Sequence, residues 1–183
     1  MNWLTPILLV TLTFAVVYVQ TSFDLTRVLL ATQIDLLPAV VVCTALFADL
    51  VSLCLVAALG GLWFDALSAN PAGVSILPLF IAGFVIFSKR EVVLREQPYA
   101  QFCLGLAASA GVPLATLLTI YTVGSNPLIV WMSLWQWFVM MLAGAAATPL
   151  LARLFHWLTL RFNYEAAPES SFQPDREIKR GRA

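Results

Sequence analysis

Long apolar runs, separated by short polar or turn-forming stretches, dominate the chain. The runs are Trp3–Val19, Leu36–Phe64, Val74–Ser88, Gln101–Val123 and Leu128–Leu151. A helix needs about 20 mainly apolar residues to cross the ~30 Å hydrocarbon core of a bilayer, and most of these runs approach or exceed that length. The pattern therefore predicts an all-α integral membrane protein.

The second run admits two interpretations. Leu36–Phe64 contains one charged residue, Asp49. As a single helix it would measure about 44 Å, which is longer than the hydrocarbon core, whereas two helices over 36–48 and 50–64 would each reach only about 20 Å. We favour two short helices, because a carboxylate at a tight bend costs less than one in the middle of the membrane. The fold class is then a bundle of six transmembrane helices, alternatively five.

Composition supports this class and sets the domain organisation. The chain is 61% hydrophobic and 11% charged, against roughly 45–50% and about 25% for a soluble domain. Its 183 residues hold one helical bundle and no separate soluble domain. We expect a transmembrane domain over 1–162 and a flexible cytoplasmic tail over 163–183, because the tail is polar, charged and too poor in apolar residues to fold alone.

Basic residues predict the orientation. They gather in the loop after the third run and just after the last run, at Lys89, Arg90, Arg95, Arg153 and Arg161. Such residues favour the cytoplasmic side. With either number of helices, the turn over Gly60–Gly73 then faces away from the cytoplasm.

That turn carries the strongest candidate site. Asp65 stands where an apolar run ends, so its carboxylate must lie at the membrane surface or in a pocket lined by protein. Asn70-Pro71 disfavours continuing helix, and Gly73 permits backbone angles that other residues avoid. We expect Asp65 to fix the turn by accepting hydrogen bonds from nearby backbone donors, with help from Ser68.

Small residues four positions apart predict close helix packing. Three pairs stand in three different runs: Ala57 with Gly61, Ala107 with Gly111, and Ala143 with Ala147. Such pairs let helix backbones approach in a membrane, and we expect all three to form core contacts.

Catalytic and metal-binding patterns are not found in the sequence. His156 is the sole histidine and stands beside Trp157, a pairing typical of a membrane interface. Asp49 and Asp65 fall at opposite ends of one short helix, so they cannot act as an acid/base pair. We expect no enzymatic activity, no cofactor, no metal and no nucleic-acid partner.

The residues of the turn carry a resemblance to a known family. Gly60, Gly61, Asp65, Ser68, Pro71 and Gly73, preceded by Leu36-Leu37-Pro38 at the start of an apolar run, resemble the MreD family of bacterial rod-shape-determining membrane proteins. The resemblance covers about residues 34–160. The family's often basic loop between the second and third spans is reduced here to Asp49, and the tail is longer than in many members.

The resemblance implies a non-enzymatic scaffold of the bacterial inner membrane that acts in cell elongation and lateral peptidoglycan synthesis. Its implied partners are MreC, the actin-like MreB, the glycosyltransferase RodA, a class B penicillin-binding protein and membrane lipid. The six residues of the turn would then shape a surface for a partner's transmembrane or juxtamembrane segment. Local capping or pairing by Asp65 is the alternative role.

The family is also thought to be similar in fold to the substrate-binding S components of energy-coupling-factor vitamin transporters. This similarity gives an alternative function, in which the chain is the substrate-binding subunit of a micronutrient transporter. That alternative predicts a small-molecule pocket that opens away from the cytoplasm.

Overall fold

A computed structural model describes most of the apolar part of the chain. The described residues are 4–22, 32, 34–68, 71–90, 97–122, 124 and 131–162. Most of the connector after the first apolar run and the predicted tail over 163–183 lie outside them. The division into a helical domain and a tail therefore stays a prediction.

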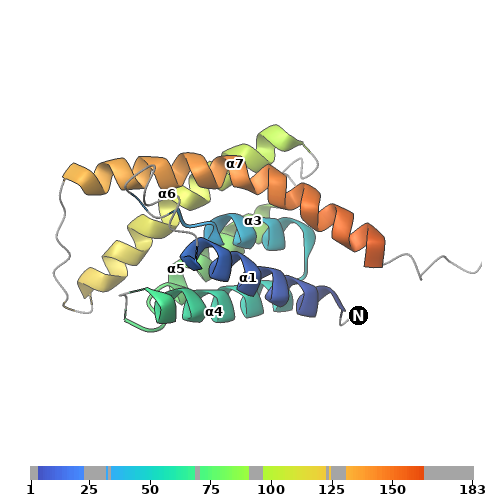
Figure 1. Ribbon diagram of the computed structural model, residues 1–183, viewed down its shortest axis with the longest axis horizontal. Coiled ribbons are helices and arrows are strands. Elements are labelled where there is room, and N and C mark those ends of the chain that lie inside the picture. The colour runs from blue at the N-terminus through green and yellow to red at the C-terminus, as the bar shows by residue number, and fades with distance from the viewer. Residues whose placement is uncertain are drawn as a thin grey trace, which may run out of the picture.

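The described residues form a bundle of α-helices, as the apolar runs predict. In chain order the helices are α1 (Leu4–Ser22), α3 (Leu37–Phe47), α4 (Leu50–Leu67), α5 (Ile76–Lys89), α6 (Pro98–Thr122) and α7 (Trp131–Phe162). Figure 1 shows α1, α4 and α7 running roughly along the long axis of the molecule, with α6 lying obliquely across α7. The last helix continues through Pro149 to Phe162. It thus includes an amphipathic stretch after the last apolar run, in which Leu154 and Phe155 alternate with Arg153 and His156.

The ambiguous run forms two helices, which confirms the favoured interpretation. The chain leaves the helical conformation at Ala48 and Asp49, both extended, and the Ser52 hydroxyl donates to the Asp49 carboxylate at the start of α4. Four helices are long and apolar enough to cross a membrane: α1, α4, α6 and α7. Since α3 and α5 are shorter apolar helices, a count of six spans stays a prediction.

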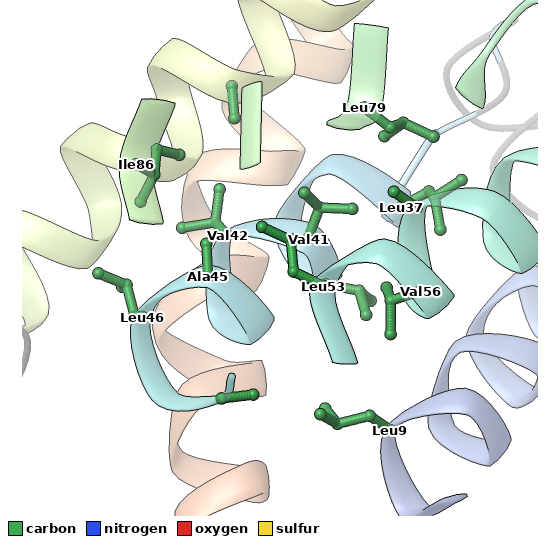
Figure 2. Close-up of a cluster of buried hydrophobic side chains, with 14 of the residues drawn as sticks. Leu9, Leu37, Val41, Val42, Ala45, Leu46, Leu53, Val56, Leu79 and Ile86 are labelled. Atoms are coloured by element: carbon green, nitrogen blue, oxygen red, sulfur yellow. The ribbon is translucent and has the colours of Figure 1, made fainter. Parts of the chain in front are cut away.

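Helix α3 forms the centre of the bundle. All residues from Leu37 to Leu46 are buried, and α3 contacts each of the other described helices. A helix that is apolar on every side is suited only to such an interior position. Figure 2 shows its side chains between Leu9 of α1, Leu53 of α4 and Ile86 of α5.

The most extensive helix contact joins α6 to α7 through small residues. A Cβ atom added at Gly105 would lie 2.8 Å from Cβ of Thr148, and one added at Gly144 would lie 2.6 Å from Cβ of Ser109. Both distances are too short for real contacts. The two backbones therefore approach closely because two glycines face Ser109 and Thr148.

This register differs from the predicted pairs. Ala107 is exposed and a Cβ added at Gly111 would meet nothing within 4 Å, so the prediction that this pair forms core contacts is wrong. Ala143 and Ala147 are only partly buried, and their neighbours Gly144 and Thr148 form the close contact instead. Of the predicted pairs, the one in α4 is buried; a Cβ added at Gly61 would lie 3.1 Å from the backbone of Ile76.

Candidate functional site

The turn is shorter than predicted, because residues 60–67 are helical and belong to α4, and the chain leaves the helix only at Ser68. Asp65, in the last turn of α4, ties this turn to the bundle. Asp65 is 2% exposed, and its carboxylate accepts hydrogen bonds from the backbone N–H of Ser75 at 3.0 Å and from the Ser75 hydroxyl at 2.5 Å. Ser75 is the residue before α5, so these bonds join the C-terminal end of α4 to the N-terminal end of α5. An acid there also interacts favourably with the α5 dipole. Asp65 therefore faces the protein interior.

The other residues of the turn have distinct positions. The Ser68 hydroxyl donates to the backbone carbonyl of Asp65 at 3.4 Å, so the expected help at the carboxylate comes from Ser75 instead. Gly73 has a positive φ of 89°, a conformation that glycine adopts without strain. Pro71 is exposed at the outer side of the turn.

Gly60 belongs to the packing below the turn. A Cβ added there would lie 2.8 Å from Thr13 of α1 and 2.9 Å from Leu37 of α3. Gly60 therefore lets three helices meet, while Gly61 on the adjoining face of α4 admits the start of α5. Both glycines shape the structure around the turn and neither is exposed.

Asp35 is a second buried carboxyl group and lies in the connector between the first two apolar runs. It is 7% exposed and precedes α3, where its Oδ1 accepts a hydrogen bond from the backbone N–H of Leu37 at 2.9 Å. The neighbouring N–H, that of Leu36, donates to Oε1 of Gln20 from α1 at 2.9 Å. Two polar side chains from different parts of the chain thus satisfy the first donors of the central helix.

Burial sets the protonation of Asp35. Loss of hydration raises the pKa of this carboxyl from 3.8 to about 6. Hydrogen bonds with the Leu37 backbone and the Gln20 side chain oppose the rise, while the negative charge of Asp65 adds to it. The two carboxyl groups are therefore electrostatically coupled.

A cavity of about 470 Å³ opens beside these groups. Part of its wall comes from Asp35, Leu37, Phe64, Ser75 and Leu79, and the rest comes from α6 over 112–120 and α7 over 133–140. Figure 1 shows α6 crossing α7, so that the end of α6 and the start of α7 diverge on the left of the view. The volume lies within the ~300–1,000 Å³ range of small-molecule pockets.

The wall of this cavity, hereafter the α6–α7 cavity, is mainly apolar with few polar groups. Ser133, Gln136 and Trp137 contribute from α7, and the Trp137 indole N–H already donates to the carbonyl of Ala110 at 3.0 Å. Asp35 is the only ionisable residue among the described residues that line it. The basic side chains that the structure describes lie toward the C-terminal ends of α5 and α7, away from the cavity. They are Lys89, Arg90, Arg153 and His156.

The sequence analysis did not single out Asp35, Ser75 or Gln20. One signal was present for Asp35: an acid followed within three residues by Pro38 is a common start of a helix, where the dipole favours negative charge. Nothing in the sequence indicates that Gln20 binds the backbone N–H of Leu36, 16 residues away.

Within the part of the chain that is described, no group of three or more His, Cys, Asp or Glu side chains could hold a metal ion. Asp49 and Asp65 lie at the two ends of α4, as the sequence analysis requires. The acids whose charges interact are Asp35 and Asp65. Their hydrogen bonds stabilise the start of α3 and the turn before α5.

Fold and site together define a helical membrane protein with an apolar cavity at one end of the bundle. Comparison with protein-family models, with curated proteins and with solved structures finds no match for this chain.

Proposed function

We propose that the chain is a non-enzymatic scaffold of the bacterial inner membrane, similar to MreD, in the machinery of cell elongation and lateral peptidoglycan synthesis. MreC is its proposed direct partner, with MreB, RodA and a class B penicillin-binding protein in the same complex. In this proposal the C-terminal end of α7 faces the cytoplasm. The reason is that basic residues lie there, Arg153 in α7 and Lys89 at the end of α5, and such residues favour the cytoplasmic side.

The observation that supports this proposal is the internal bonding of the turn. Asp65 and Ser75 are hydrogen-bonded to each other and hold the two ends of the turn together. The exposed residues Pro71 and Ala72 lie between them and have no reactive side chain. Such an exposed turn is suited to contact with another protein. The exposed small residues Ala107 and Gly111 of α6 offer a second surface for a partner helix, because the described part of the chain does not cover them.

Photocrosslinking in the bacterium that carries this chain tests the proposal. A photoreactive amino acid at Ala72 should crosslink to MreC, and the same residue at Asp49, on the opposite end of α4, should not. Depletion of the chain should also round rod-shaped cells. If neither MreC nor RodA is recovered from Ala72 or Gly111 and cell shape is unchanged on depletion, the scaffold proposal is wrong.

The α6–α7 cavity favours the substrate-binding subunit of a transporter as a second candidate function. A saturable vitamin-like ligand, found by a thermal-shift screen on the purified protein, would support it over the scaffold. No such ligand is required by the scaffold proposal.

A further inference from the structure

We propose that the α6–α7 cavity binds an amphiphile with an apolar body and an ammonium head, and that Asp35 receives the head. This inference concerns the chemistry of the cavity and is independent of whether the chain is a scaffold or a transporter subunit.

The first step is the charge of the site. Asp35 is buried, lines the cavity and lies close enough to Asp65 for their charges to interact. No Lys, Arg or His occurs among the described residues that line the cavity. A ligand with a carboxylate or phosphate facing Asp35 would be repelled, whereas an ammonium group would supply the positive charge that the described lining lacks.

The second step is what each carboxylate already binds. Both oxygen atoms of Asp65 accept hydrogen bonds from Ser75, so Asp65 is committed to the turn. Asp35 accepts a hydrogen bond from the Leu37 backbone at its Oδ1, and the Gln20 side chain also favours its ionised form. Its raised pKa shows that these interactions do not offset the loss of hydration of the ionised form. An ammonium head would offset it by a charge-assisted hydrogen bond.

The third step is the shape of the remainder. Beyond Asp35 and Ser75 the wall consists mainly of Leu, Val, Ile and Met side chains of α6 and α7, with Phe64 and Trp137. This apolar wall favours binding of an alkyl or aromatic body, because apolar surface of the ligand is removed from water there. The remaining polar lining residues are Ser133 and Gln136 at the start of α7 and Thr116 of α6, whose hydroxyl donates to the carbonyl of Val112.

Photolabelling of the purified full-length chain in lipid nanodiscs tests the inference. The probe is dodecylamine with a diazirine in its alkyl chain, and the matched probes carry a hydroxyl or a carboxylate in place of the amine. We expect saturable labelling of α6 over 112–120 and α7 over 133–140 by the amine, with the carboxylate at least tenfold weaker. Labelling that does not saturate, or that is equal for all three head groups, would overturn the inference.

Variants locate the head group. Asp35→Asn should weaken amine labelling about tenfold, the loss expected for one charge-assisted hydrogen bond. Asp49→Asn is the matched control at the opposite end of the bundle and should leave it unchanged. Because Asp35→Asn also alters the start of α3, Leu117→Trp provides a second test: it fills the cavity from a partly exposed position and should also reduce labelling. Amine labelling that survives both variants would refute the site.

Competition distinguishes two sources of the ammonium head. If phosphatidylethanolamine displaces the probe and phosphatidylcholine does not, the natural ligand is an aminolipid. If neither lipid competes while short free amines do, the ligand is a free amine. Equal displacement by these two lipids and by phosphatidylglycerol, which has no ammonium group, would show a site for acyl chains alone and would overturn the role of Asp35.

Discussion

Replacing Gly144 by alanine should separate α6 from α7. The added methyl group would lie 2.6 Å from Cβ of Ser109 and would also meet its hydroxyl oxygen. Cβ is fixed to the α6 backbone, so a side-chain rotation cannot relieve the contact and the helices must move apart. The contact between α6 and α7, which is the most extensive helix contact of the described bundle, would then open.

The magnitude follows from two opposing terms. Alanine in place of glycine stabilises a helix interior by about 1 kcal/mol, and forcing extra methyl groups into a packed interface costs roughly 1–3 kcal/mol or more. The steric term should prevail at Gly144. Gly111→Ala is the matched control in α6, since a Cβ there meets nothing within 4 Å. It keeps only the favourable term and should be neutral or stabilising by up to about 1 kcal/mol.

Cys43 provides the assay. It is buried in α3, and its thiol lies 3.5 Å from the carbonyl oxygen of Thr148 in α7, while Cys54 and Cys103 are exposed. After replacement of the two exposed cysteines by serine, a fluorogenic thiol reagent should react with Cys43 only when the bundle opens. Gly144→Ala should lower the temperature at which this reaction occurs, and Gly111→Ala should not.

A second substitution tests the stated cause. Ser109→Gly removes the atoms that the new methyl group would meet, so the double variant should recover much of the stability lost in Gly144→Ala. Equal melting of the Gly144 and Gly111 variants, or failure of Ser109→Gly to restore stability, would refute the packing argument.

Three further predictions use the same thermal assay. Asp65→Ala leaves two buried donors without their acceptor and should destabilise the fold by about 2–4 kcal/mol, whereas Ser68→Ala removes only a 3.4 Å hydrogen bond and should change it by less than about 0.5 kcal/mol; equal effects would contradict the assignment of the tie. Because the pKa of Asp35 is raised from 3.8 to about 6, the folded state binds its proton more tightly than the unfolded state, so stability should rise as pH falls from 8 to 4, by up to about 3 kcal/mol. Asp35→Asn should remove that rise, and an unchanged pH profile would exclude Asp35 as its source. Arg90→Ala removes a 2.7 Å hydrogen bond to the last turn of α3 and a cation–π contact and should cost about 1–2 kcal/mol, while Lys89→Ala, at an exposed neighbour, should be neutral.

Helix positions were largely predictable because apolar runs follow the thickness of a bilayer. The break near Asp49 was predicted from the cost of a buried charge, although that stretch has no Gly, Pro or Asn. The continuity of α7 through Pro149 was consistent with the amphipathic pattern that follows the last apolar run. Membrane helices tolerate proline where neighbouring groups satisfy the freed carbonyl.

Packing register was not predictable from the same pattern. The stretch around Ala107 and the one around Ala143 each contain several small residues, so more than one pair has the required spacing. In the structure Gly105 faces Thr148 and Gly144 faces Ser109. Which small residues meet depends on how α6 and α7 are rotated about their axes. That rotation is set by contacts with α3, which lie far away in the sequence.

The central helix explains why residues that look peripheral in the sequence matter to this fold. At about 16 Å, α3 reaches only halfway across a hydrocarbon core of ~30 Å, so its two ends cannot both lie at a membrane surface, and the backbone groups of at least one end need partners within the protein. Asp35 and Gln20 bind the N–H groups at its start, and Arg90 donates to the carbonyl of Ala48 at its end. A short interior helix thus requires polar side chains from α1 and α5, and the buried acid that completes its start also lines the cavity.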